Sequence, residues 1–159
     1  MAELHPSIAI LAPLLGSWVG RGSGEYPTIA PFTYTEEVSI GHTGKPFFTY
    51  SQRTRSEDGQ PLHAETGYIR MPSTGRVELI IAHPTGVAEV EEGTITVTQA
   101  GLVLDVQSTM VAATTSAKEV AALSRSIRVG AEELSYTLQM AAVGLPLQHH
   151  LRAILCRQQ

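Results

Sequence analysis

Hydrophobic and polar residues alternate along most of the chain beyond Gly16. In residues 32–40, for example, Phe32, Tyr34, Val38 and Ile40 share one face of an extended segment, and the residues between them are mostly polar. A period of two is typical of a half-buried β-strand. After a first strand that starts at Gly16, such runs cover residues 32–40, 47–55, 63–71, 77–81, 87–91, 94–98, 102–110, 120–129, 134–143 and 147–157. The pattern predicts roughly ten or eleven consecutive strands.

No segment after residue 20 has the periodicity of an amphipathic helix, which excludes alternating βαβ folds. The connections between the runs are short and favour an up-and-down meander. A meander of this length is best closed into a barrel, because closure removes exposed strand edges. We therefore expect an all-β protein, an antiparallel barrel of about ten strands similar to lipocalins and fatty-acid-binding proteins. Residues 8–15 are apolar, follow Pro6, and predict a short N-terminal helix.

Length, net charge and cysteine content restrict the classes of protein to which this chain can belong. The 159 residues suffice for one domain, so a single barrel domain is expected over residues 1–159. The formal charge of −4 argues against a nucleic-acid partner. The apolar segment 8–15 lacks a preceding basic residue and is too short to span a bilayer, so no membrane association is expected. Cys156 is the single cysteine, which fits a reducing, cytoplasmic setting.

The first strand carries glycines at alternate positions around one tryptophan, in the order Gly16, Trp18, Gly20 and Gly22. Such glycines allow a strand to bend and leave space for a neighbouring backbone or a flat ligand. A tryptophan that follows a short helix commonly closes the floor of a lipocalin-like barrel. The segment is not a phosphate-binding loop, because it lacks the Lys-Ser/Thr ending and a following helix.

The polar residues form no recognisable catalytic motif. Glu36-Glu37 and Glu91-Glu92 are adjacent on strands, point to opposite faces, and are interpreted as solvated surface. The six histidines match no zinc pattern, and there is no Cys-x-x-Cys-His haem attachment. We interpret His5, His42 and His63 as surface or satisfied core residues, and His83, which precedes Pro84, as a turn residue.

His149 and His150 differ from the other histidines because they are adjacent on the last strand, so that one must face the interior. His149 shares its parity with Leu147, Leu151 and Leu155. A simple rule of apolar residues inside would therefore turn His149 inward. A cavity for a polar-edged ligand need not follow that rule, and the residues alone leave the choice open.

Specific residues along nearly the whole chain resemble the nitrobindin family. The opening Gly16-x-Trp18-x-Gly20-x-Gly22 with Tyr26-Pro27-Thr28-Ile29 carries the resemblance most specifically. The match continues through Gly44-Lys45-Pro46-Phe47, Glu65-Thr66-Gly67-Tyr68, His83-Pro84-x-Gly86, Ala117-Lys118-Glu119-Val120, Leu134-Ser135-Tyr136 and His150-Leu151-x-Ala153-x-Leu155.

This resemblance implies a ten-stranded barrel that binds one b-type haem per subunit noncovalently at its mouth. It implies that His150 is the axial iron ligand and that His149 faces away. By the same resemblance Lys118 contacts the haem edge, and Thr28 and His83 line the pocket. The implied activity is isomerisation of peroxynitrite to nitrate at ferric haem, together with binding of nitric oxide. An imidazole nitrogen is a suitable ligand for haem iron.

Two alternatives stay open at this stage. One is a nitric oxide carrier or sensor without physiological catalysis, which needs the same haem. The other is a lipocalin-like carrier of an apolar ligand without iron, which rests on fold analogy alone. Leu147, Leu151 and Leu155 suggest an apolar outer face on the last strand and hence a homodimer.

Overall fold

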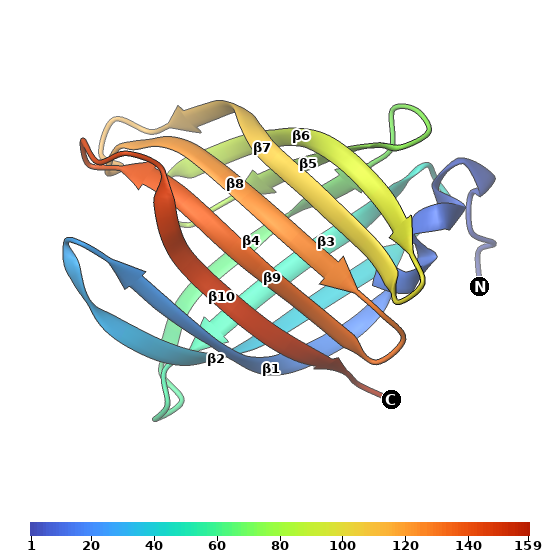
Figure 1. Ribbon diagram of the computed structural model, residues 1–159, viewed down its shortest axis with the longest axis horizontal. Helices are drawn as coiled ribbons and strands as arrows, with labels where there is room; N and C mark the ends of the chain where they lie inside the picture. The colour runs from blue at the N-terminus through green and yellow to red at the C-terminus, as the bar shows by residue number, and fades with distance from the viewer.

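A computed structural model describes residues 1–159 as ten antiparallel strands preceded by one 3₁₀-helix (Figure 1). The elements are η1 (Pro6–Leu14), β1 (Gly16–Tyr26), β2 (Ile29–His42), β3 (Phe47–Arg55), β4 (Pro61–Arg70), β5 (Arg76–Ala82), β6 (Val87–Thr98), β7 (Gly101–Ala113), β8 (Val120–Val129), β9 (Glu133–Ala142) and β10 (Gln148–Arg157). Each strand pairs with its neighbours in sequence, and β1 pairs with β10. The predicted ten-stranded closed barrel is confirmed. The structure has no helix of the length and hydrophobicity that crossing a bilayer requires.

The expectation of two separate strands over 87–91 and 94–98 is wrong. Both runs belong to β6, which pairs without a turn along β7. The alternation is hard to see because inward positions of β6 hold Glu89 and Glu91 instead of apolar side chains. Gly93 does not mark a turn. A Cβ atom there would lie 1.8 Å from the carbonyl oxygen of Asp105, so glycine permits the close approach of β7.

Helix η1 closes one end of the barrel, as Figure 1 shows near the N-terminus. Its apolar side chains Ile8, Leu11 and Leu14 are buried. Trp18, fully buried, donates a hydrogen bond from Nε1 to the carbonyl oxygen of Leu14 at 2.9 Å. The tryptophan therefore forms the predicted floor of the barrel. It also attaches η1, which we call the plug, directly to the first strand.

Two glycines of β1 leave space for neighbouring groups in the barrel wall and in the barrel interior. A Cβ atom on Gly20 would lie 2.1 Å from the backbone oxygen of Ile154, on the neighbouring strand β10. A Cβ atom on Gly22 would lie 2.4 Å from the Tyr34 ring. The space at Gly20 is thus taken by a neighbouring backbone, as expected from the sequence, whereas the space at Gly22 is taken by an interior aromatic ring.

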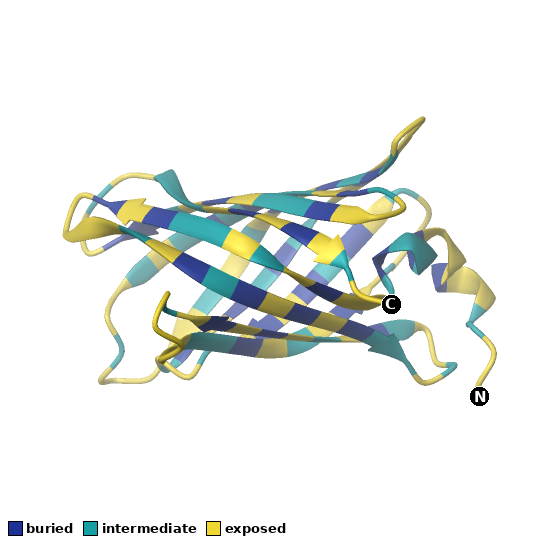
Figure 2. Cartoon of the chain, turned by 90° about the horizontal axis from the view of Figure 1, so that it is seen from below, coloured by how far each residue is buried: buried dark blue, intermediate teal, exposed yellow.

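Buried and exposed residues alternate along the strands, as the banding in Figure 2 shows. The apolar core occupies the half of the barrel next to η1 and includes Trp18, Phe48, Leu104 and Leu155. The up-and-down topology places five turns at the opposite end: those between β1 and β2, β3 and β4, β5 and β6, β7 and β8, and β9 and β10. We call this end the mouth.

Candidate functional site at the mouth

The structure brings the four residues expected to contact haem to the mouth. Thr28 lies in the turn between β1 and β2, and Lys118 lies in the loop between β7 and β8; both are exposed. His83 directly follows the end of β5, and its side chain is mostly buried. His150 is the third residue of β10. Residues spread over more than 120 positions of sequence thus share one end of the barrel.

The imidazole of His150 is held in one tautomer. Its Nδ1 atom lies 2.9 Å from the backbone carbonyl oxygen of Glu25. A carbonyl oxygen only accepts, so Nδ1 carries the proton and the lone pair of the neutral ring lies on Nε2. The ring of Tyr26 packs against the His150 ring edge-on, with centroids 5.4 Å apart. The hydroxyl of Tyr26 in turn accepts a hydrogen bond from the backbone N–H of Ala142 on β9 at 2.8 Å.

Burial lowers the pKa of His150 below its ordinary value, outweighing the hydrogen bond to Glu25, which raises it. The neutral ring is therefore the form present near neutral pH. A neutral imidazole with a free Nε2 atom is the form that ligates a metal.

A register shift at His150 interrupts the alternation on which the parity argument for the histidine pair depends. In the pairing of β10 with β9, His149 lies opposite Gln139 and Leu151 opposite Leu138, so His150 is an extra residue. Such a bulge breaks the alternation of faces. Ala153 and Leu155 are buried in the barrel, yet the parity they share with His149 does not extend past the bulge.

The burial of Leu155 corrects the sequence-based argument for a homodimer. Leu155 is fully buried inside the barrel, so Leu147, Leu151 and Leu155 do not form an apolar outer face. The exposed apolar side chain on the outer face of β10 is Ile154.

A buried layer of charged side chains crosses the barrel below the mouth. Arg125 on β8 is at its centre and is buried. Its Nε atom donates to Glu91 Oε1 at 2.6 Å, Nη1 donates to Glu65 Oε1 at 3.1 Å, and Nη2 donates to Glu89. Tyr50 adds a hydrogen bond to Glu65 Oε1 at 2.6 Å. One arginine thus ties together carboxylates from β4 and β6.

These carboxylates differ in protonation because they differ in partners. Burial, the largest single effect, would raise the pKa of Glu65 and of Glu89, but Arg125 together with the neighbouring histidines holds both below their ordinary value. Burial raises the pKa of Glu91 to about 7, despite Arg125. The layer therefore carries a net negative charge near neutral pH.

The interpretation of Glu36-Glu37 and Glu91-Glu92 as solvated surface is half wrong. The members of each pair point to opposite faces as expected, but Glu36 and Glu91 are buried inside the barrel. Glu36 accepts hydrogen bonds from Tyr136 at 2.7 Å and Gln52 at 3.1 Å. Burial raises its pKa to about 7. A polar barrel interior supplies partners that the strand pattern cannot reveal.

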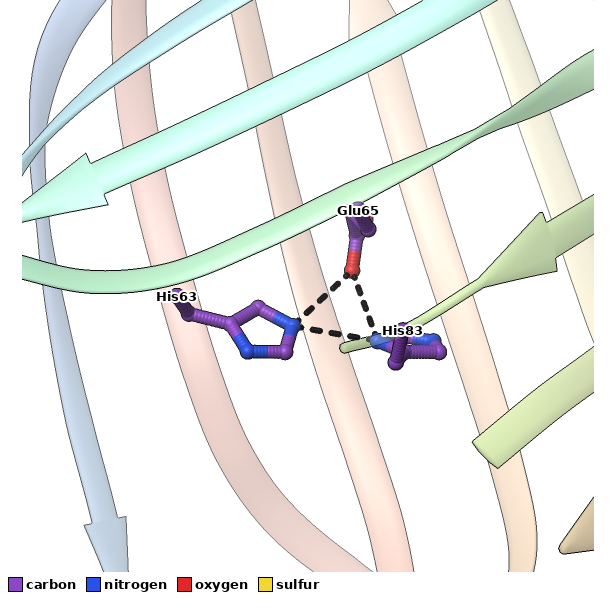
Figure 3. Close-up of side chains that lie close together, drawn as sticks. All are labelled: His63, Glu65 and His83. Carbon is purple, nitrogen blue, oxygen red and sulfur yellow. Dashed lines mark hydrogen bonds and ion pairs between the residues drawn. The ribbon is translucent and has the colours of Figure 1, made fainter. Parts of the chain in front are cut away.

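His63 and His83 are not isolated histidines as the sequence suggested. Figure 3 shows them converging with Glu65. His63 lies near the start of β4 and His83 directly follows β5, so both lie at the mouth. His63 Nε2 lies 3.0 Å from His83 Nδ1, and Glu65 Oε2 lies 3.6 Å from the first atom and 3.4 Å from the second. His83 therefore does more than form a turn before Pro84.

Little free volume exists between the plug and the charged layer. The cavity lined by Leu14, Leu104, Tyr50, Arg125 and other mostly apolar residues holds about 40 Å³. That volume is enough for about one or two water molecules. The interior between the plug and the charged layer therefore has no room for a larger ligand.

Sequence reasoning missed Arg125 and Glu89 as members of the interior. A signal was present, because each charged residue shares its strand face with apolar residues. Arg125 shares its parity with Leu123, Ile127 and Val129, and Glu89 shares its parity with Val87. Charged residues in the apolar register of several strands indicate a buried ionic layer.

A closed barrel, plugged at one end and presenting a neutral, oriented histidine at the other, defines a protein that binds a ligand or cofactor at its mouth. Residues 7–157 match the family model described as "THAP4-like, heme-binding beta-barrel domain". The chain belongs to this haem-binding family, and its resemblance to the nitrobindins is confirmed.

Full-length relatives and a solved structure agree with this assignment. The chain is 56% identical over 158 residues to peroxynitrite isomerase 1 of Mycolicibacterium paratuberculosis, covering 99% of this chain and 98% of the relative. It is 56% identical over 155 residues to the peroxynitrite isomerase of Nocardia farcinica, covering 97% and 92%. The crystal structure of Rv2717c from M. tuberculosis superimposes with a TM-score of 0.96 at 54% identity, covering 99% of this chain and 100% of that one.

Proposed function

We propose that this protein is a haem-dependent peroxynitrite isomerase in which His150 is the axial ligand and catalytic residue. The observation that carries the proposal is the His150 ring, whose Nδ1 proton is committed to the carbonyl of Glu25 while Nε2 is left free at the mouth. The relatives named as peroxynitrite isomerases, at 56% identity over nearly the whole chain, supply the reaction.

The residues at the mouth fit a haem held without covalent attachment. A neutral imidazole whose second nitrogen donates to a carbonyl is the usual arrangement for a histidine ligand, because the outer hydrogen bond fixes ring orientation and raises basicity. Tyr26 restrains the other edge of the ring. We assign Lys118 to the propionate edge, since an exposed ammonium group at the mouth can pair with a carboxylate. Thr28 and His83 complete the proposed pocket.

The haem, when bound, supplies an iron centre for rearrangement of peroxynitrite to nitrate, a reaction with no net transfer of electrons. The chain has three tasks. His150 would hold the iron, the turns at the mouth would confine the reactants, and the filled interior below the mouth would prevent deeper entry. No partner that delivers electrons is needed.

The test is turnover of peroxynitrite followed as nitrate yield, comparing haem-loaded with haem-free protein and with haem-loaded His150→Ala. We expect the loaded wild-type protein to accelerate decay and to raise the nitrate yield. Equal rates and yields for loaded wild-type and haem-free protein would rule the isomerase out, and a haem spectrum without acceleration would leave a haem protein of the nitric oxide carrier class.

Three further properties belong to the proposal. Nitric oxide is a second ligand of the same haem, and the reducing cytoplasm is the compartment in which the exposed thiol of Cys156 remains reduced. A homodimer would use the outer faces of β1 and β10, where Val19 and Ile154 are exposed. Sedimentation of the purified protein at several concentrations measures its oligomeric state.

A further inference from the structure

The three-residue cluster just inside the mouth has the geometry of a metal site distinct from the haem ligand. His63 and Glu65 are two positions apart on β4 and therefore project from the same face of the strand. His83 reaches them from the end of β5. The three nearest atoms, His63 Nε2, His83 Nδ1 and Glu65 Oε2, form a triangle with sides of 3.0, 3.4 and 3.6 Å.

We propose that His63, Glu65 and His83 bind a divalent cation of the zinc type, with a fourth position left for water. Zinc prefers imidazole nitrogen and carboxylate oxygen at about 2.0–2.2 Å in tetrahedral geometry, which places neighbouring ligand atoms about 3.3–3.6 Å apart. The sides of the observed triangle bracket that separation. Two histidines and one carboxylate form a known three-ligand set for zinc with an open fourth position.

The surroundings complete the site beyond its ligands. Glu65 Oε1 is occupied by Arg125 and Tyr50, so Oε2 is the oxygen directed to the histidines. The second nitrogen of His83, Nε2, is buried without a hydrogen-bond partner and lies 3.6 Å from Glu89 Oε1. A metal-ligating histidine characteristically directs its other nitrogen at a carboxylate, and this pair provides that outer contact.

Charge balance gives an independent reason for a cation at this place. Arg125 is the one arginine in the buried layer and faces the carboxyl groups of Glu65, Glu89 and Glu91. The carboxylate oxygens Glu89 Oε2 and Glu91 Oε2 are buried with no hydrogen-bond partner. Buried negative charge without compensation is costly, and a divalent cation beside Glu65 offsets it.

The proposal is tested by calorimetric titration of Zn²⁺ into the full chain, both haem-free and haem-loaded. We expect one saturable site in each form. His63→Ala should weaken binding more than about 100-fold, because loss of an outer-shell partner alone costs 10–100-fold. His63 is partly exposed, so its removal should preserve the fold. His83→Ala should have the same effect, and His5→Ala, a half-buried histidine outside the cluster, should have none.

Two further measurements separate this site from the haem ligand. His150→Ala should keep full zinc affinity even where haem is lost. Co²⁺ added to the haem-free chain should give the intense visible bands of tetrahedral coordination, and His63→Ala should abolish them. Absence of a saturable site in wild-type protein overturns the proposal, and so does binding that survives both His63→Ala and His83→Ala. Zinc binding lost only in His150→Ala also overturns it, because the metal then sits on the terminal histidine pair.

Discussion

The Nδ1 atom of His150 lies 2.9 Å from the carbonyl oxygen of Glu25, so a backbone group of the first strand orients a side chain of the last. The two strands meet only because the barrel is closed by the pairing of β1 with β10. The pairing of β1 with β10 that closes the barrel therefore also orients the imidazole of His150.

His150→Ala should weaken haem binding by about 100-fold or more, since removal of an outer-shell partner alone costs 10–100-fold. The reason is loss of the imidazole whose Nδ1 is held by the Glu25 carbonyl and whose Nε2 is left free at the mouth. Titration of hemin followed by the Soret band measures the affinity. His149→Ala is the matched control and should retain wild-type affinity; a larger loss for His149→Ala than for His150→Ala would reverse the ligand assignment.

Gly20→Ala should destabilise the barrel by roughly 2–3 kcal/mol, the upper range for overpacking. A Cβ atom at Gly20 meets the backbone oxygen of Ile154 at 2.1 Å, and a paired backbone cannot move aside. Gly41→Ala is the control, because its Cβ atom would meet only the hydroxyl of Thr49 at 3.2 Å. Chemical denaturation of both variants gives the comparison, and similar losses at the two positions would contradict the assigned role of Gly20.

The free energy of unfolding should fall with rising pH because Glu36 is buried. Burial raises its pKa from 4.5 to about 7, so between these values the folded protein holds a proton that the unfolded chain releases. The stabilising contribution is complete below pH 4.5 and is lost as pH rises through 7. From pH 5 to 8 the free energy of unfolding should fall by up to about 3 kcal/mol from this group.

Denaturation at several pH values tests this prediction. Glu36→Gln should reduce the slope between pH 5 and 8 without abolishing it, because the pKa of Glu91 is also raised to about 7. Glu37→Gln, on the exposed outer face, should leave the slope as in wild type. A slope unchanged by Glu36→Gln would show that this carboxyl titrates normally.

Arg157→Ala should loosen the plug and cost roughly 2 kcal/mol or more, given that hydrogen bonds to charged groups contribute 1.5–3 kcal/mol. The guanidinium donates to the carbonyl oxygens of Leu15 at 2.6 Å and Pro13 at 2.8 Å, and it lies 4.1 Å from the centre of the Trp18 ring. Trp18 is the sole tryptophan, so its fluorescence reports the change directly.

Arg157→Lys is the matched control for that experiment. It keeps the positive charge near Trp18 but cannot donate to several carbonyl oxygens in the planar geometry of arginine. Its stability should therefore lie between those of wild type and Arg157→Ala. Equal stability of Arg157→Ala and wild type would show that the plug is held by apolar packing alone.

The sequence by itself determined the strands, the plug and the closed barrel. Alternation is a local property of a strand, so runs such as 120–129 are visible without any knowledge of partners. It did not determine which strands merge, because Glu89 and Glu91 interrupt the apolar register of β6. The family resemblance supplied the haem and selected His150, which alternation alone did not.

Only the tertiary structure decided how the side chains of the site are oriented and which of them meet, because these contacts depend on pairing between distant strands. The bulge opposite Gln139 and Leu138 turns His150 toward Tyr26, and a register shift of this kind leaves no trace in residue type. The partners of Arg125 come from strands separated by 34 to 60 residues, so their charges meet only after closure. The same holds for His63 and His83, which the local pattern presents as two unrelated histidines and the folded barrel places 3.0 Å apart.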